Sequence, residues 1–187
     1  MRIMVTGGAR SGKSSFAERY AASLGTAGTY IATAQPFDEE MEVRLALHKE
    51  RRNESGFPWT TVEEPLAVAD CLRSHAPAVD QVVLIDCLTL WLSNWLFRYE
   101  QEPDMEERVG RRVDELAEAV RGYAGTVLLV TNEVGSGIVP EYKLGRVYRD
   151  LAGRMNQRIA EVCEEVFLVT SGIPVELKRL AFRLGTE

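Results

Sequence analysis

Short runs of consecutive apolar residues recur along the chain and alternate with longer segments that have helical periodicity. The runs lie at residues 2–6 (RIMVT), 29–33 (TYIAT), 82–86 (VVLID), 126–131 (TVLLVT) and 166–170 (VFLVT). Apolar runs of this length, bounded by turn residues, are typical of strands that are buried on both faces of a sheet. The pattern therefore predicts five strands of a mostly parallel central sheet.

Between these runs, apolar residues recur every three or four positions, which is the period of a helix with one buried face. The segments with this pattern are 13–24, 38–52, 65–75, 88–96, 105–123 and 144–163. Strands that alternate with helices predict an α/β protein with helices on both faces of the sheet. The length of 187 residues suits a single domain, 1–187.

A glycine-rich segment, GGARSGKS, lies between the first predicted strand and the first predicted helix and matches G-x-x-x-x-G-K-[ST]. Glycines let backbone N–H groups turn toward phosphate oxygens, and the helix N-terminus adds partial positive charge. Lys13 is expected to contact the β- and γ-phosphates, and the Ser14 hydroxyl to bind Mg²⁺. The motif predicts a P-loop nucleotide-binding protein, and with the alternating strands and helices we expect a single-domain P-loop NTPase fold, RecA-like in type. The residues of the motif are Gly7, Gly8, Ala9, Arg10, Ser11, Gly12, Lys13 and Ser14.

Asp86 ends the third predicted strand, where a second ligand of the nucleotide-bound Mg²⁺ is expected. The same carboxylate is also suited to cap the helix that follows at Leu88, and both roles are compatible. A P-loop alone does not separate a kinase from an ATPase motor or a GTPase switch. The sequence contains no N-K-x-D guanine-reading motif and therefore gives no sign of a Ras-like switch.

The segment 44–52, RLALHKERR, surrounds a histidine with cations. On a helix, Arg44, Arg51 and Arg52 share one face with His48. Neighbouring positive charge favours the neutral, nucleophilic imidazole and attracts phosphate. Such a ring can attack an α-phosphate, forming a phosphoramidate and releasing pyrophosphate. Periodicity alone equally allows a solvated helix face.

The amino-acid composition limits the partners and the cellular location that we expect. Lys plus Arg is 22 and Asp plus Glu is 28, which gives a net charge of −6 and argues against a broad nucleic-acid-binding face. The three cysteines, Cys71, Cys87 and Cys163, are far apart and are expected to be buried free thiols. The longest apolar stretch contains Asp86 and is too short to span a bilayer. We therefore expect a cytoplasmic protein.

Several distinctive motifs follow one another along the chain. They are GGARSGKS, YIATAQPFDEEMEVRLALHKERR, WTTVEEP, LIDCLTLWLSNWL and VTNEVGSGIVPEYKLGRVYRDLAGRMNQRIAEVCEEVFLVTSGIPVELK. Together they resemble the bifunctional adenosylcobinamide kinase / adenosylcobinamide-phosphate guanylyltransferase family of cobalamin biosynthesis, over nearly the whole chain. The P-loop is shared with many families. The A-T-x-x-x-x-D-x-E-M segment, DCLTLWLSN and TNEVGxGIVP are much more distinctive.

The resemblance implies two reactions. One phosphorylates the aminopropanol hydroxyl of adenosylcobinamide with ATP or GTP. The other transfers GMP from GTP to adenosylcobinamide phosphate, with release of pyrophosphate, through a GMP-histidine intermediate. It also implies Mg²⁺ as cofactor and a homo-oligomer, for instance a trimer.

Carried onto this sequence, the resemblance places the guanylylated histidine at His48. Its nucleotide contacts fall on the P-loop and on Ala32, Thr33, Ala34, Lys49, Glu50, Arg51, Arg52, Glu63 and Asp86. For Glu63 we hypothesise, from its chemistry alone, that the carboxylate accepts from the guanine N1–H and 2-amino groups. Many members have Arg-Pro soon after the histidine helix, whereas here Arg52 is followed by NESGFPW, a longer connector.

Some alternatives remain open at this point. Trp91 and Trp95 suit either an aromatic platform for the corrin ring or core packing. The loop EVGSGIVP, which begins at Glu133, suits a lid over the substrate. Two other functions share the P-loop: a small-molecule kinase without a covalent intermediate, and a nucleotide-dependent regulatory or assembly ATPase.

Overall fold

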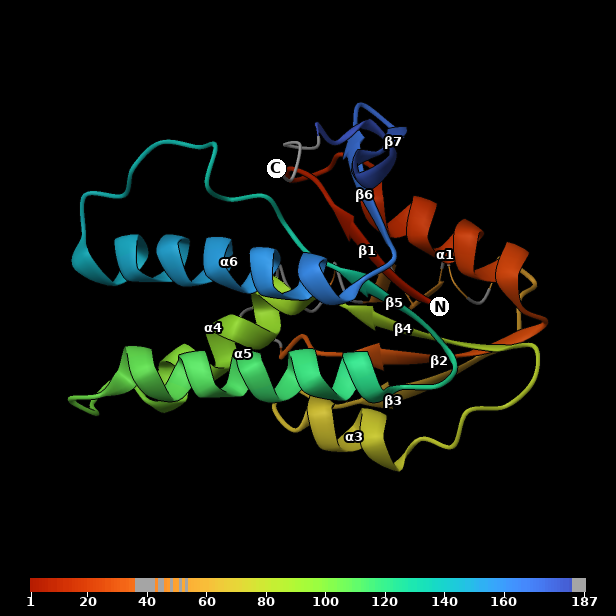
Figure 1. Ribbon diagram of the computed structural model, residues 1–187, viewed down its shortest axis with the longest axis horizontal. Coiled ribbons are helices and arrows are strands. Elements are labelled where there is room, and N and C mark those ends of the chain that lie inside the picture. The colour runs from red at the N-terminus through yellow and green to blue at the C-terminus, as the bar shows by residue number, and fades with distance from the viewer. Residues whose placement is uncertain (36–42, 44–45, 48, 51, 53, 183–187) are drawn as a thin grey trace, which may run out of the picture.

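A central sheet organises the protein (Figure 1). The computed structural model describes residues 1–35, 43, 46–47, 49–50, 52 and 54–182. Within this part of the chain the sheet has seven strands, in the order β3-β2-β4-β5-β1-β6-β7. The strands are β1 (Arg2–Thr6), β2 (Ala27–Ala32), β3 (Trp59–Glu63), β4 (Gln81–Asp86), β5 (Thr126–Val130), β6 (Glu165–Thr170) and β7 (Ile173–Glu176). Strands β1 to β6 pair in parallel, and β7 pairs antiparallel with β6.

The five predicted strands are confirmed, with ends that differ by at most two residues. β2 begins at Ala27, two residues before its predicted start, and β5 ends at Val130. β3 and β7 were not predicted. β3 is mostly exposed, and β7 contains Pro174 at the sheet edge, so neither presents a continuous apolar run.

Helices cover both faces of the sheet, as predicted. α1 packs on one face, and α3, α4, α5 and α6 form a layer on the other (Figure 1). The helices are α1 (Lys13–Leu24), α3 (Val68–Ser74), α4 (Leu88–Arg98), α5 (Met105–Gly122), α6 (Lys143–Val162) and α7 (Leu177–Leu180). The described positions between 43 and 52 are helical, and the rest of the helix predicted at 38–52 lies outside the described residues.

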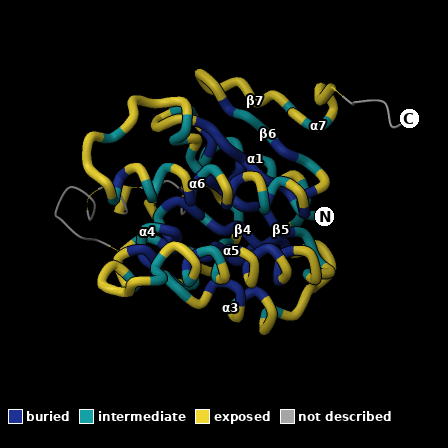
Figure 2. Tube along the Cα trace, turned by 60° about the vertical axis from the view of Figure 1, so that its left-hand side comes forward, coloured by how far each residue is buried: buried dark blue, intermediate teal, exposed yellow. Residues whose placement is uncertain are grey.

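The core lies between the sheet and these helices, where the chain is buried (Figure 2). Trp91 and Trp95 of α4 are buried there, and both indole N–H groups donate to the carbonyl of Leu66, at 2.9 and 3.2 Å. Core packing is therefore the correct interpretation of this pair, and a platform for the corrin ring is not. Cys87 and Cys163 are buried free thiols, as expected, while Cys71 is partly exposed.

The register places the candidate site along one edge of the sheet. Ala32 is paired on one side with Glu63 and on the other with Asp86, and Asp86 is paired with Val130. Val130 is in turn paired with Val5, just before the P-loop. Because parallel strands end at the same edge, the segments after β1, β5, β4, β2 and β3 meet there. Among the described residues, no helix has both the length and the apolar composition needed to cross a membrane.

Candidate functional site

The P-loop has a backbone shaped for an anion. Arg10 and Gly12 have positive φ angles of 56° and 93°, which turn the chain sharply before α1. Gly12 is the N-cap of α1 and makes no side-chain cap bond to the helix. The first turn, from Lys13 onward, contains no acidic residue. Its N–H groups and the helix dipole are therefore available for a phosphate.

Neighbouring strands brace this loop by direct backbone contact. A Cβ atom on Gly7 would lie 2.4 Å from the carbonyl oxygen of Val169, at the end of β6. Gly172, in the turn that follows β6, donates its N–H to the carbonyl of Ser11 at 2.9 Å. On the other side, the N–H of Glu133 donates to the carbonyl of Gly7 at 3.1 Å. The loop therefore keeps its shape through contacts with the ends of both adjacent strands.

Lys13 lies over this loop. Only 9% of the residue is exposed, and its Nζ donates to the carbonyl of Gly8 at 3.1 Å. Ser14, the next residue, is half-buried in the first turn of α1. The lysine and the hydroxyl thus stand at the N-terminal end of α1. Their contacts with phosphate and Mg²⁺ stay predictions.

Asp86 is half-buried at the end of β4 and does not cap α4. The N-cap of α4 is Cys87, and no side chain caps this helix, so the capping interpretation of Asp86 is wrong. Its Oδ2 instead accepts from the hydroxyl of Tyr30 at 3.1 Å. The carboxylate is therefore oriented by a residue of β2, the strand next to β4.

The donor set at this edge fits Mg²⁺ held together with a nucleotide. Within the described residues, no group of three or more His, Cys, Asp or Glu side chains could hold a metal ion. The Ser14 hydroxyl and the Asp86 carboxylate are hard oxygen donors, of the kind that Mg²⁺ prefers. Mg²⁺ commonly takes one or two protein ligands and completes its shell with phosphate and water. The residues present therefore suit this ion.

The segment after β2 is tied to the segment after β4. Thr33 is fully buried, and its hydroxyl donates to the carbonyl of Cys87 at 2.8 Å and accepts from the N–H of Cys87 at 2.9 Å. Its carbonyl accepts from the side chain of Asn94 at 2.9 Å. Thr33 therefore holds the chain beside Asp86, whereas Ala32 and Ala34 are partly exposed there.

Glu63 lies at the far end of the same edge. It is exposed at the end of β3, which is four strands away from β1 in the sheet. Neighbouring strands lie about 4.8 Å apart, so roughly 19 Å separates the two strand ends. The fold thus brings Glu63 next to Ala32 but not next to the P-loop.

The histidine segment is described only in part, and His48 and Arg51 lie outside the described residues. Lys49 and Glu50 are exposed. Arg52 is only 5% exposed, and its guanidinium carbon lies 3.6 Å from the centroid of the Tyr30 ring. A fully solvated helix face is therefore the wrong interpretation at Arg52.

Two residues at this edge were not recognised in the sequence. Tyr30 contacts both Arg52 and Asp86, and burial, reinforced by the charge of Asp86, holds its pKa well above the usual value. Asn132, just after β5, donates to the Thr89 hydroxyl at 2.6 Å. Only the strand order reveals these contacts, because β5 stands between β1 and β4, and β2 stands beside β4.

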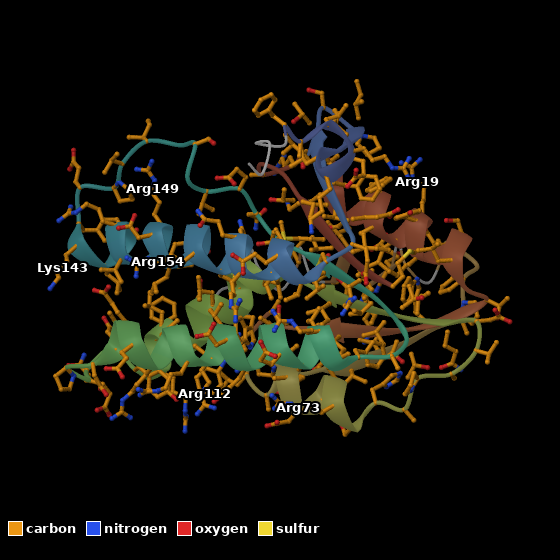
Figure 3. The ribbon with its side chains drawn as sticks, in the orientation of Figure 1. Arg19, Arg73, Arg112, Lys143, Arg149 and Arg154 are labelled. Atoms are coloured by element: carbon orange, nitrogen blue, oxygen red, sulfur yellow. The ribbon has the colours of Figure 1, made fainter. Side chains whose placement is uncertain are left out.

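The long loop between β5 and α6 rises from the same edge (Figure 1). The carboxylate of Glu133 turns back and accepts from the N–H of Gly135 at 2.7 Å. Arg149 of α6 donates to the carbonyl of Gly135, and Figure 3 shows this arginine on the side of α6 that faces the loop. At the tip, Ile138 is 96% exposed.

A groove of about 400 Å³ runs along α1 on its outer side. One wall is formed by α1, and the other by residues 54, 55 and 57 of the connector that precedes β3. The lining residues are Ser15, Glu18, Arg19, Ala22, Glu54, Ser55 and Phe57. Residues 54, 55 and 57 of this connector therefore face the P-loop helix.

Comparisons with known proteins show which family the chain belongs to. A protein from Pseudomonas aeruginosa, "Bifunctional adenosylcobalamin biosynthesis protein CobP", is 47% identical over 178 residues, covering 95% of this chain and 98% of its own. Proteins named "Bifunctional adenosylcobalamin biosynthesis protein CobU" from Escherichia coli and Salmonella typhimurium are each 42% identical, covering 95% of this chain and 100% of their own.

Among solved structures, the RadB recombinase overlaps 89% of this chain and 73% of its own, with a TM-score of 0.48 and 15% identity. The family model described as "Cobinamide kinase / cobinamide phosphate guanyltransferase" matches residues 3–177, which include the strands and helices named above except the first residue of β1 and the last three residues of α7. The chain therefore belongs to the cobinamide kinase / cobinamide phosphate guanyltransferase family and is an enzyme of this kind.

Proposed function

We propose that this enzyme carries out two successive transfers on a corrinoid. It phosphorylates the aminopropanol hydroxyl of adenosylcobinamide with ATP or GTP, and it then transfers GMP from GTP to adenosylcobinamide phosphate. The observation that carries the proposal is the braced P-loop with Lys13 above it and Asp86 at the same sheet edge. The family match over residues 3–177 supports both reactions.

In the first transfer, the substrate hydroxyl attacks the γ-phosphorus, the bond to the β-phosphate oxygen breaks, and the nucleoside diphosphate leaves. The backbone N–H groups of the P-loop and Lys13 would stabilise the charge on the phosphate oxygens. We propose that Ser14 and Asp86 hold Mg²⁺, which when bound supplies further charge neutralisation. The half-buried position of Asp86, fixed by Tyr30, supports this role.

In the second transfer, we propose that a ring nitrogen of His48 attacks the α-phosphorus of GTP. A phosphorus–nitrogen bond forms, the bond to the β-phosphate oxygen breaks, and pyrophosphate leaves. The phosphate of adenosylcobinamide phosphate then attacks the same phosphorus and releases the imidazole. Lys49, Arg51 and Arg52 follow His48 directly in the sequence and would stabilise the charge on the oxygens.

We propose that Glu63 recognises guanine. Glu63 is exposed and lies next to Ala32, at the sheet edge where the candidate site lies, and this position supports the role. Because its strand end lies about 19 Å from that of β1, a GTP that reaches both must lie along the edge, above β2, β4 and β5. We further propose a single domain that assembles into a homo-oligomer, for instance a trimer, a state that light scattering would measure.

Labelling with GTP tests this proposal. Incubation with α-³²P-GTP and Mg²⁺ should label the enzyme with an acid-labile, base-stable bond, because a phosphoramidate has this behaviour. γ-³²P-GTP should leave no label. His48→Ala should abolish labelling, and Glu63→Gln should slow it while leaving phosphorylation of adenosylcobinamide by ATP much less affected.

Labelling that persists in His48→Ala would show that another residue carries GMP. Phosphorylation of adenosylcobinamide without labelling would instead indicate a kinase that has no covalent intermediate. Equal losses with GTP and ATP in Glu63→Gln would exclude the guanine role of Glu63. Mass analysis of products from adenosylcobinamide, and then from its phosphate, identifies which transfers occur.

A further inference from the structure

Tyr30 connects two candidate residues that come from separate segments of the chain. The residue is 5% exposed, in the middle of β2, on the face of the sheet that α1 covers. Its hydroxyl donates to Oδ2 of Asp86 at 3.1 Å, and its ring lies 3.6 Å from the guanidinium carbon of Arg52. One side chain thus contacts the end of β4 and the end of the histidine segment.

The hydroxyl sets the direction of the Asp86 carboxylate. Tyr30 is paired with Leu84, so its hydroxyl reaches along the same sheet face to Asp86, two residues further on. A carboxylate with one oxygen held by a donor has a fixed rotamer, and its other oxygen then has a defined direction. Asp86 is therefore oriented before any ligand is bound.

The ring holds Arg52. A buried guanidinium is unfavourable unless it has partners, and an aromatic face at this distance is a favourable one. The carbonyl of Arg52 also accepts from the N–H and the hydroxyl of Ser55, at 3.2 and 2.6 Å. Arg52 follows His48 by four positions in the sequence, so these contacts fix the end of the segment that contains the histidine.

We infer that Tyr30 is a positioning residue for both transfers, and that its two parts act separately. The hydroxyl orients Asp86 for Mg²⁺, which both transfers use. The ring holds Arg52, whose positive charge we assign to the GMP transfer alone. The assignment of the two steps rests on the proposed function, whereas the two contacts of Tyr30 do not.

Tyr30→Phe removes the hydroxyl and keeps the ring. The Mg²⁺ concentration at which GTP half-maximally raises the melting temperature should increase about tenfold, since a hydrogen bond to a charged group is lost. The ratio of the GMP-labelling rate to the kinase rate should stay as in the wild type. Tyr20→Phe is the matched control, because it removes a similar bond to Glu165 at 2.6 Å, and the Mg²⁺ midpoint should not change.

Tyr30→Leu removes the ring as well. In the absence of metal and nucleotide, phenylglyoxal should then modify Arg52, which should stay protected in the wild type and in Tyr30→Phe. The ratio of GMP labelling to kinase rate should fall. Arg52→Met, with Tyr30 intact, should lower the same ratio and covers the case in which Tyr30→Leu does not fold.

A Mg²⁺ midpoint in Tyr30→Phe equal to that of Tyr20→Phe would overturn the role of the hydroxyl. Continued protection of Arg52 in Tyr30→Leu, or an unchanged ratio in Arg52→Met, would overturn the role of the ring. A wild-type enzyme that takes up no GMP would contradict the proposed function instead. The Mg²⁺ midpoint and the phenylglyoxal pattern would still test the two contacts in that case.

Discussion

The β1–α1 and β5–α6 connections leave adjacent strands at the same edge of the sheet, yet they are held in different ways. The first is the P-loop, fixed by main-chain bonds at Gly7 and Ser11 to the ends of both neighbouring strands. The second forms an arch, and side chains of the following helix, Arg146 and Arg149, donate to its carbonyls. Figure 2 shows the arch as exposed chain beside the buried sheet.

This difference shows that one edge of the sheet combines a rigid connection, the P-loop, with an adjustable one, the arch. A phosphate cradle must present its N–H groups in one arrangement, and main-chain contacts on both sides provide this. A loop held by long arginine side chains can change shape without disturbing the strands. The P-loop is therefore suited to the phosphate groups that all nucleotides share, whereas the arch is a connection that can adapt its shape.

Replacing a glycine by alanine should give the largest difference in stability between the two connections. In Gly7→Ala the new Cβ would lie 2.4 Å from the carbonyl of Val169, so we expect a loss of about 3 kcal/mol in the free energy of unfolding. In Gly137→Ala the new Cβ would lie 3.6 Å from the carbonyl of Val134, an ordinary contact, and the change should stay within about 0.5 kcal/mol. Urea unfolding measures both.

Equal losses in the two glycine variants would contradict the contrast between a braced loop and an open arch. GTP binding adds a second check, since Gly7→Ala should also lose GTP binding while Gly137→Ala retains it. A stable Gly7→Ala protein that binds GTP normally would show that the contact with β6 does not shape the loop.

Removal of the arginines should loosen the arch and leave the rest of the protein unchanged. In the double variant Arg146→Ala, Arg149→Ala, the arch loses the hydrogen bonds that the charged guanidinium groups donate to its carbonyls, so its open form should become more populated. Cleavage by a glutamyl endopeptidase after Glu133 and Glu141 should therefore accelerate about tenfold. The melting temperature should stay nearly constant. Arg154→Ala, further along the same helix (Figure 3), is the control and should be cleaved at the wild-type rate.

The smallest expected effect is on stability, and it comes from an ion pair at the end of the sheet where the parallel strands begin. An acid titration measures it. Arg2 at the start of β1 donates to the Glu164 carboxylate beside β6, which lowers the pKa of Glu164 to about 2. A lowered pKa in the folded state stabilises the protein above the unfolded pKa of about 4.3, and this stabilisation is lost as the pH falls toward 2. Because Glu164 is 44% exposed, the contribution should be below about 1 kcal/mol.

The measurement compares the wild type with Glu164→Gln by urea unfolding between pH 7 and pH 2. The difference in unfolding free energy should be constant above about pH 5 and should shrink below it, in line with the unfolded pKa. A difference that grows toward low pH would have the wrong sign for this ion pair.

The sequence predicts the part of this protein that repeats a strong local pattern. The five apolar strands and the P-loop could be found because burial on both faces, and a fixed glycine spacing, leave a mark within a few residues. β3 could not be found, because Trp59–Glu63 is an edge strand with mostly exposed residues. Pro174 likewise hides β7, because proline is rare in strands.

The remainder of the site depends on which strands are neighbours. Tyr30 is 56 positions from Asp86 in the sequence, and nothing local to either residue indicates their hydrogen bond. The brace between Ser11 and Gly172 is equally remote. Local patterns predict the roles of Lys13 and Asp86, whereas the contacts that orient these side chains follow from the strand order.

The place of β1 in the sheet also has a consequence for synthesis on the ribosome. β1 is the first strand to be made, but its partners are residues 127–130 on one side and 165–168 on the other. The P-loop receives its last brace only from Gly172. The nascent chain therefore carries a complete phosphate-binding sequence long before it has a phosphate-binding shape, and nucleotide can stabilise the braced loop only after residue 172 has been made.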